Sequence, residues 1–135
     1  MSAERKNLRN VENLTVRFAS RRHPFSAVNG VSFHIFEGET FGLVGESGCG
    51  KSVTSLSILR IVQSPPGRII AGEILHNGKD LLKHSERYMR TTRGTDISMI
   101  FYEPITSFNP VVHVRPQHLA SRTPHQGTTQ HNGPA

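Results

Sequence analysis

The chain has 135 residues, a hydrophobic fraction of 35% and a formal net charge of +6, with an isoelectric point near 10.3. This length allows one modest domain with a single core, and the one cysteine, Cys49, excludes a disulfide framework within the chain. No apolar run approaches the ~20 residues that a membrane-spanning helix needs, and the charged amino terminus lacks the apolar region of a secretory signal. The composition therefore predicts a cytoplasmic protein.

The positive charge raises the question of nucleic-acid binding, for which a basic surface is the usual signature. The basic residues are scattered along the chain, and only Arg5-Lys6 and Arg21-Arg22 form tight pairs. No aromatic residues alternate with basic ones, as a stacking platform for bases would require. We therefore expect no nucleic-acid partner. A basic surface near anionic phospholipid, or a solvated face, explains the charge as well.

Two segments near the amino terminus have the pattern of strands. Residues 11–19 alternate partly between apolar and polar positions, and so do residues 27–36. The first segment places three apolar side chains on one side: Leu14, Val16 and Phe18. Two alternating strands joined by a short turn predict an antiparallel layer ahead of the rest of the fold.

A glycine-rich loop follows a short apolar strand over residues 41–44 and precedes a helical pattern over residues 53–62. The loop matches G-x-x-x-x-G-K-[ST] without a mismatch, in the residues Gly45, Glu46, Ser47, Gly48, Cys49, Gly50, Lys51 and Ser52. A strand before this motif and a helix after it are the context that the motif requires. The sequence therefore predicts a phosphate-binding loop of the Walker A type.

The residue types of this loop suit a nucleotide. Glycines let the backbone turn tightly and direct successive N–H groups inward, which makes a concave site for anions. The following helix presents its positive dipole end to the same phosphate. Lys51 is placed to reach the β- and γ-phosphates, and the Ser52 hydroxyl is a hard oxygen ligand suited to Mg²⁺.

After the glycine-rich loop and its helix, the sequence predicts two further strands with a short helix between them. Residues 69–76 predict a strand closed by the turn dipeptide Asn77-Gly78. Residues 86–93 predict a short helix, and residues 96–101 predict a compact apolar strand. After residue 112 the chain is rich in Pro, Gln, Thr, His and Gly, and this composition predicts a disordered tail. The histidines of this tail do not have the spacing of metal ligands.

Three stretches, residues 28–62, 71–82 and 89–111, together resemble the nucleotide-binding subunit of ABC transporters, most closely the oligopeptide/dipeptide importer branch. The combination of GESGCGKS with ISMIF-x-EP-x-TS-x-NP carries this resemblance. It implies an α/β P-loop NTPase fold, incomplete here, with an N-terminal antiparallel β layer. It also implies an ATP-binding subunit that lies on the inner face of the cell membrane, docked on permease subunits and paired with a second nucleotide-binding subunit.

The resemblance assigns ATP and Mg²⁺ as cofactors and extends the site beyond the loop. Gly45 to Ser52, with Val53 directly after, would hold the phosphates, and Ser52 would be the metal ligand. Family members use an upstream aromatic residue to stack on adenine. Phe25 is the candidate for that role and Phe18 the reserve, although a flat ring in a strand core is the alternative for both.

Several family elements have no counterpart in this sequence. Tyr102 stands where the family has a glutamine that reaches Mg²⁺, and a neutral phenol is a poor ligand for a hard cation. No LSGGQ-like signature, no apolar strand ending in Asp-Glu and no switch histidine follow. Phosphoryl transfer depends on positioning and charge stabilisation by such residues. The sequence thus offers no complete catalytic set, and we expect these 135 residues not to be a competent ATPase.

The missing elements also bear on the fold. The family's sheet has further strands beside residues 41–44 and 97–101, so we expect these two strands to keep unpaired backbone and exposed apolar faces. We predict a partial ABC nucleotide-binding domain over residues 1–112 and a disordered or frame-shifted tail over 113–135. Two alternatives stay open, namely half of a split ATPase completed by a second chain, and a non-catalytic basic binding protein that retains a phosphate loop.

Overall fold

The computed structural model describes residues 6–20, 22–102, 109 and 111–117. Most of the predicted tail, including His118, His125 and His131, lies outside these residues. The chain divides into two compact units, Met1–Ser85 and Glu86–Ala135, and each is described by itself.

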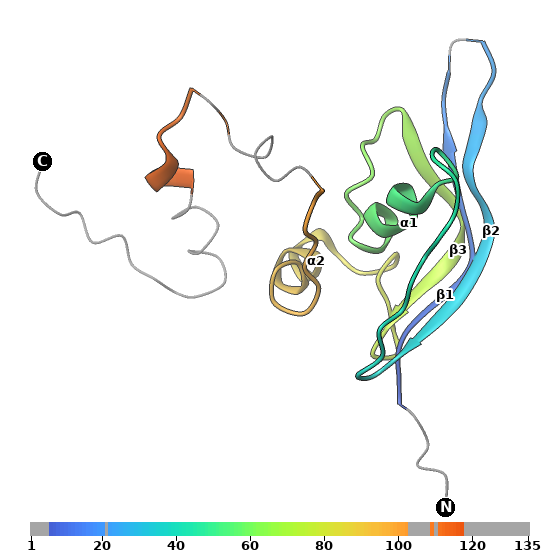
Figure 1. Cartoon of the computed structure of the whole chain (residues 1–135), viewed down its shortest axis with the longest axis horizontal. Helices are drawn as coiled ribbons and strands as arrows, with labels where there is room; N and C mark the ends of the chain where they lie inside the picture. The colour runs from blue at the N-terminus through green and yellow to red at the C-terminus, as the bar shows by residue number, and fades with distance from the viewer. Residues whose placement is uncertain (1–5, 21, 103–108, 110, 118–135) are drawn as a thin grey trace, which may run out of the picture. The chain divides into compact units, whose positions relative to one another are not determined.

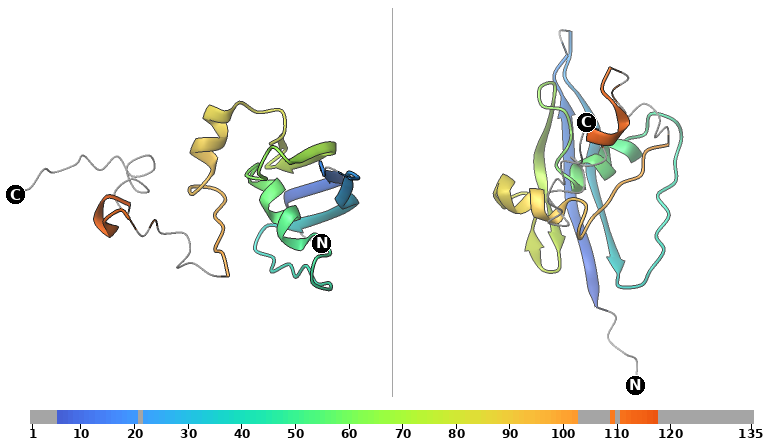
Figure 2. Two further views of the ribbon diagram at one scale, coloured as in Figure 1. Left: turned by 90° about the horizontal axis from the view of Figure 1, so that it is seen from above. Right: turned by 90° about the vertical axis from the view of Figure 1, so that its left-hand side faces the viewer.

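The first unit is built on one antiparallel sheet with the strand order β2-β1-β3-β4 (Figure 1). Its strands are β1 Asn7–Phe18, β2 Phe25–Phe36, β3 Gly67–His76 and β4 Lys79–Asp80. One helix, α1 Lys51–Ile58, lies against the concave face of the curved sheet (Figures 1 and 2). The buried apolar side chains of this unit are Val11, Leu14, Val16, Val28, Ile58, Leu59, Ile74 and Leu81.

The predicted antiparallel layer is confirmed. Both expected amino-terminal strands exist and pair directly, with Phe18 opposite Phe25 at the end of the ladder. The strand expected over 69–76 joins the same sheet, because β3 pairs along the other side of β1. The expected turn Asn77-Gly78 links β3 to β4, and both of its residues have positive φ, as a type I′ hairpin turn requires.

The sheet bends sharply at one level. Three residues with positive φ, Asn13, Gly30 and Gly72, lie near register shifts between β1 and its two neighbours. Such register shifts mark bulges or other irregularities in the pairing, and a bulge increases the bend and twist of a strand. Because the irregularities share a level, the sheet curves and offers a concave face to α1 (Figure 1).

Helix α1 is shorter than the predicted 53–62 at its carboxyl end. Arg60 adopts a left-handed conformation (φ 52°), and the amides of Arg60 and Ile61 donate to the carbonyls of Ser57 and Leu56 at 3.0 Å each. This pair of bonds is a Schellman motif, which ends a helix. The Arg60 guanidinium donates to Leu81 O at 3.1 Å and His84 O at 2.6 Å. These long-range contacts hold an arginine in a conformation that usually favours glycine.

The prediction of a strand over residues 41–44 is wrong. This segment has no strand pairing in the structure, although Phe41 stacks on Phe33 of β2 with ring centroids 5.0 Å apart. Val44 is 89% exposed, and Phe41 and Leu43 are each 39% exposed. A strand needs a hydrogen-bonding neighbour, and no described segment pairs with this one. The exposure of Val44 agrees with the expected exposed apolar side chains, although the segment is not a strand.

The second unit contains helix α2, Glu86–Thr92, close to the predicted span of 86–93. An ion pair between Glu86 and Arg93 links its first turn to the residue after its end. The strand predicted over 96–101 is wrong, because only an isolated bridge joins Ile97 to Arg93. Ile100 is 91% exposed, in agreement with the expected exposed apolar face. A helical turn follows at residues 114–117.

Asp80, at the end of β4, makes an acid-sensitive contact. Its Oδ1 accepts from Leu82 N at 3.0 Å, and its Oδ2 lies 2.9 Å from Lys83 Nζ. Burial raises the pKa of the Asp80 carboxyl, but the hydrogen bonds from Lys83 and the backbone outweigh that effect, so its pKa lies below the ordinary value. A lowered native pKa means stability that is present above the unfolded pKa of about 3.9 and lost as pH falls through the native pKa.

We therefore expect Asp80→Asn to lower the free energy of unfolding at pH 7 by about 1 kcal/mol and to flatten its decline below pH 4. Urea unfolding followed by circular dichroism between pH 2.5 and 7 measures both effects. Glu37→Gln is the matched control, since the Glu37–Lys6 pair is 3.7 Å long and both side chains are mostly exposed. An acid dependence in Asp80→Asn as steep as that of the unaltered chain would contradict the assignment.

Candidate nucleotide-binding site

The glycine-rich loop turns directly into α1. Gly50 is the N-cap residue with φ 94° and is buried, and its carbonyl accepts from Thr54 N at 2.9 Å. Earlier in the loop, Cys49 N donates to Glu46 O at 3.3 Å, which closes a tight turn. The backbone therefore curls ahead of a helix amino terminus, where unpaired N–H groups and the helix dipole favour an anion.

The Lys51 side chain folds back over this loop. Its ammonium donates to Gly45 O at 2.8 Å and to Glu46 O at 2.6 Å, and it lies 3.5 Å from Cys49 Sγ. An ammonium carries three donors and no acceptor, so each of these neighbours engages one N–H direction. The positive charge is thus held across the concave side of the loop by weak neutral acceptors that a phosphate oxygen would outcompete.

A pocket of about 280 Å³ joins the loop to the end of the β1–β2 hairpin. Phe18 and Phe25 lie at its apolar end with ring centroids 5.7 Å apart and an angle of 14° between the planes. Lys51 and Ser52 supply the only polar side chains among its described lining residues. The pocket thus combines flat apolar surface with cationic and hydroxyl groups, as a nucleotide requires.

The structure brings most of the predicted site residues together. Six of them line this pocket: Phe25, Gly48, Gly50, Lys51, Ser52 and Val53. The reserve aromatic, Phe18, lines it too. Four predicted residues do not line it: Gly45, Glu46, Ser47 and Cys49. Of these, Gly45 and Glu46 contact Lys51 through their carbonyls, and Cys49 is exposed.

Ala27 is the lining residue that sequence reasoning missed. It lies on β2, and a Cβ at residue 50 would overlap its carbonyl oxygen. The contact is made by backbone, so no side-chain pattern in the sequence signals it. Through this contact β2 sets the position of the loop.

Ser52 is exposed on the first turn of α1, where its hydroxyl is accessible to a cation held by bound phosphates. Among the described residues, no group of three or more His, Cys, Asp or Glu side chains forms a further metal site.

Tyr102, at the family's glutamine position, lies in the second unit and is fully exposed. Within the described part, no helix is long and apolar enough to cross a membrane.

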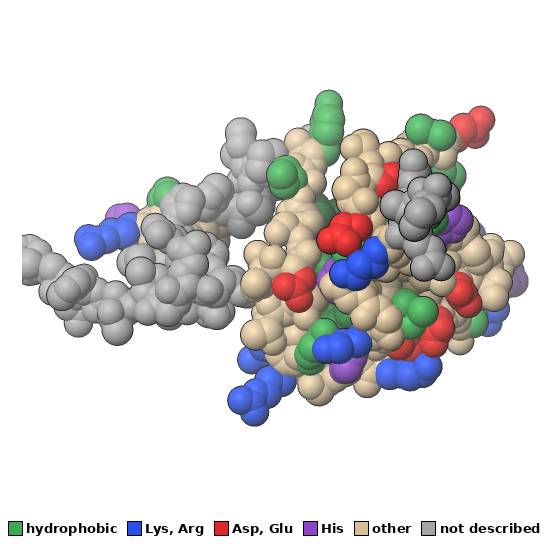
Figure 3. Space-filling model, turned by 90° about the horizontal axis from the view of Figure 1, so that it is seen from below, with side chains coloured by type: hydrophobic (Ala, Val, Ile, Leu, Met, Phe, Trp, Pro, Cys, Tyr) green, Lys and Arg blue, Asp and Glu red, His purple; other side chains and the backbone are tan. Residues whose placement is uncertain are grey.

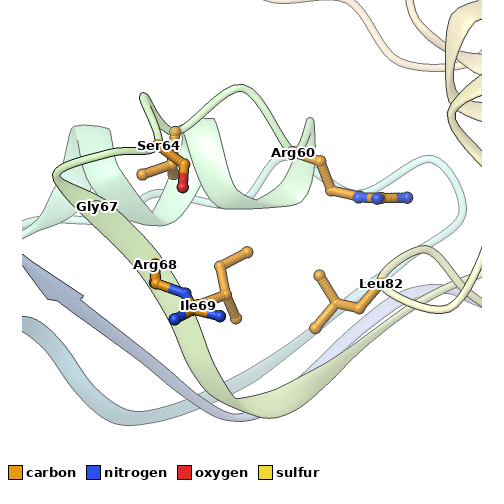
Figure 4. A pocket seen from close by; sticks show the side chains of 7 residues that line it. Arg60, Ser64, Gly67, Arg68, Ile69 and Leu82 are labelled. Atoms are coloured by element: carbon orange, nitrogen blue, oxygen red, sulfur yellow. The ribbon is translucent and has the colours of Figure 1, made fainter.

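Two other surface features do not enlarge this site. On the face drawn in Figure 3, basic side chains are interspersed with acidic ones rather than gathered into a stripe. A second pocket of about 300 Å³ lies between the end of α1 and β3 (Figure 4), and none of the predicted site residues lines it. Arg60 at its edge is bonded to backbone carbonyls, and in the figure its side chain runs away from Arg68.

The antiparallel layer and the loop–helix unit define a nucleotide-binding chain of the P-loop class. Residues 28–131 match the sequence family described as ABC transporter, which is most of the chain, so this protein belongs to the ABC transporter family. Nucleotide binding is the property that a domain of this family implies.

Curated relatives are peptide transport proteins by name. The chain is 50% identical over 107 residues to the oligopeptide transport ATP-binding protein AppD of Bacillus subtilis, which covers 79% of this chain and 33% of AppD. It is 49% identical over 107 residues to the dipeptide transport ATP-binding protein DppD of the same organism, covering 79% and 32%. DppD of Escherichia coli is 42% identical over 120 residues, covering 89% and 36%. The chain thus spans about a third of the length of these relatives.

Proposed function

We propose that this chain binds ATP with Mg²⁺ as part of the ATP-binding subunit of an ABC importer for peptides. The single observation that supports this most strongly is the pocket in which Lys51, Ser52 and the aromatic ring of Phe25 converge. The names of the relatives, which are oligopeptide and dipeptide transport ATP-binding proteins, support peptides as the cargo.

Each part of the nucleotide has a matching part of the site. The triphosphate lies at the amino terminus of α1, where Lys51 exchanges its carbonyl acceptors for phosphate oxygens. The Ser52 hydroxyl provides one oxygen ligand for Mg²⁺, whose other ligands come from phosphate and water. The base lies at the apolar end of the pocket, beside the phenylalanine rings.

In this proposal the chain works at the inner face of the cell membrane. Its partners are the permease subunits of an importer and a second nucleotide-binding subunit. This assignment follows from family membership and from the names of the relatives.

Removal of the Lys51 ammonium tests the proposal. We expect the unaltered chain to bind Mg-ATP and Lys51→Ala to weaken this binding more than tenfold, because a charge-assisted contact to phosphate is worth about 1.5–3 kcal/mol. Isothermal titration calorimetry with Mg-ATP measures the affinity, and circular dichroism checks that the variant keeps its fold.

Lys6→Ala is the matched control. Lys6 is an exposed lysine of the same unit, paired only loosely with Glu37 at 3.7 Å, so its loss should leave ATP affinity within twofold. Equal affinity of Lys51→Ala and the unaltered chain would show that the loop is not the phosphate site. If Lys51→Ala and Lys6→Ala weakened ATP binding equally, the loss of affinity would be explained by the lower net charge and not by a contact of Lys51 with phosphate.

A further inference from the structure

Thr54, the fourth residue of α1, bonds twice to the residue that ends the glycine-rich part of the loop. Its amide donates to Gly50 O at 2.9 Å, and its Oγ1 hydroxyl donates to the same oxygen at 3.0 Å. A carbonyl oxygen has two lone pairs, so it accepts both bonds. Thr54 is only 3% exposed and is not among the described residues that line the nucleotide pocket. Its side chain therefore acts on the loop from inside the fold.

The two bonds fix the orientation of one peptide group of the loop. The carbonyl of Gly50 and the N–H of Lys51 belong to the same planar trans peptide, in which they point in opposite directions. Because the Gly50 carbonyl is directed along α1 toward Thr54, the Lys51 N–H is directed out of the helix amino terminus, where the loop curls. The first amides of a helix have no acceptor within that helix. The Lys51 N–H is thus one of the backbone donors that an anion at this terminus would use.

Gly50 is a residue at which such fixation matters. Its φ of 94° lies in a region that glycine enters and leaves at little cost, so the backbone does not hold this peptide by itself. On one side Ala27 O of β2 occupies the space that a Cβ at residue 50 would need. On the other side the Thr54 hydroxyl holds the carbonyl. A second bond to the carbonyl also polarises the peptide group, which makes its N–H a stronger donor.

Two other hydroxyls of α1 make the same type of bond and show what is particular to Thr54. Ser57 Oγ donates to Val53 O at 2.7 Å from a fully buried residue, and Ser55 Oγ donates to Lys51 O at 3.3 Å. A buried hydroxyl needs a partner, and bonds of this type do not strengthen a helix. The acceptor of Ser57 lies inside the helix, whereas the acceptor of Thr54 is the N-cap residue of the loop.

We infer that Thr54 is a positioning residue of the phosphate loop. Its hydroxyl holds the Gly50–Lys51 peptide in the orientation that directs the Lys51 N–H at a bound phosphate. The residue lies outside the loop motif and on the side of the loop away from the ligand. This inference rests on the proposed function, since it concerns the same loop.

Exchange of the Thr54 hydroxyl for a methyl group tests this role. Thr54→Val keeps the shape of the side chain, and Gly50 O keeps the amide of residue 54 as a partner. From the contribution of a single hydrogen bond, we expect affinity for the Mg²⁺ complexes of ATP and of inorganic tripolyphosphate to fall about three- to tenfold. The two ligands should be weakened equally, because they share the phosphates and only ATP carries a base. Isothermal titration calorimetry measures both affinities.

Two control variants separate positioning from structure. Thr54→Ser keeps the hydroxyl and loses the methyl group, so its affinity should stay within about twofold of that of the unaltered chain. Ser57→Ala removes a buried hydroxyl with the same bond one turn later in α1, and it should also stay within about twofold. Equal weakening by Thr54→Val and Ser57→Ala would assign the effect to the helix and overturn the inference. A Thr54→Ser variant as weak as Thr54→Val would overturn it too.

The backbone amide proton of Lys51 provides a readout that helix stability alone does not move. In the ¹⁵N-labelled unaltered chain, saturating tripolyphosphate should shift this resonance downfield, because a proton bonded to a phosphate oxygen is deshielded. Ser57→Ala should show the same shift, and Thr54→Val a clearly smaller one. An identical shift in Thr54→Val would show that the hydroxyl does not direct the Lys51 N–H.

Failure of the proposed function gives a different result. If the unaltered chain binds neither ATP nor tripolyphosphate, the proposed function and the role of Thr54 are both overturned. If the unaltered chain binds both ligands and Thr54→Val binds them equally well, the proposed function stands and only the role of Thr54 is overturned. Circular dichroism identifies a variant that has lost its fold. If Thr54→Val is that variant, Thr54→Ala replaces it with the same expected loss of affinity, since it also removes the hydroxyl and needs less space.

Discussion

Gly50→Ala is expected to lower the free energy of unfolding by about 2–6 kcal/mol and to remove ATP binding. Gly50 has φ 94°, where an L-residue is strained by about 1–3 kcal/mol. The added methyl would overlap Ala27 O and lie 3.3 Å from Val28 Cγ2, and crowding in a packed region costs a further ~1–3 kcal/mol. Relief requires the loop to move away from β2, which separates Lys51 and Ser52 from the aromatic end of the pocket.

Gly48→Ala is the matched control for this prediction. Gly48 has φ 80° in the same loop, but a Cβ there meets nothing within 4 Å. We expect it to cost only the backbone strain, about 1–2 kcal/mol. Urea unfolding gives both free energies, and titration with Mg-ATP gives the affinities. If Gly50→Ala were no more destabilising than Gly48→Ala, the close approach of β2 to the loop would be disproved.

Gly72→Ala is expected to be comparably damaging to the sheet. Gly72 lies in β3 at the bend, with φ 104°, and a Cβ there would lie 2.6 Å from Leu14 Cα, 2.7 Å from Glu12 O and 2.8 Å from Asn13 C. All three neighbours are backbone atoms of β1, so no side chain can rotate to make room. We expect a loss of about 2–5 kcal/mol, a large share of the stability of a small domain.

The control for Gly72 is Gly78, in the turn between β3 and β4. It has φ 75° and open space around its Cβ position, so Gly78→Ala should cost only backbone strain. Thermal unfolding followed by circular dichroism compares the two variants. A melting temperature of Gly72→Ala equal to that of Gly78→Ala would mean that the strands separate freely at the bend.

Local pattern predicted the elements whose hydrogen-bonding partners follow nearby. The strands over 11–19, 27–36 and 69–76 and the turn Asn77-Gly78 were all predictable, because their partners belong to the same antiparallel sheet. The segment over 41–44 has the same apolar character but no partner in the described chain. Strand formation is a property of a pair of segments, which no single segment encodes.

The candidate site likewise has features that the sequence predicts and features that depend on the pairing of strands. The residues of the loop are readable from the motif, because their spacing is dictated by the phosphate that they would hold. The contact between Gly50 and the Ala27 carbonyl was not readable, since backbone atoms make it. The stacking of Phe18 on Phe25 could not be predicted from the sequence either, because it depends on the strand register that places the two residues opposite each other.

The phosphate-loop motif, the antiparallel layer and the family resemblance could all be recognised in the amino-acid sequence, and the family match over residues 28–131 confirms the resemblance. Each rests on short-range pattern, namely glycine spacing or period-two alternation. Only the folded chain shows how β2 positions the loop, how Phe18 and Phe25 stack and where α1 ends. Those features arise from contacts between residues far apart in the chain, and their geometry exists only once the strands have paired.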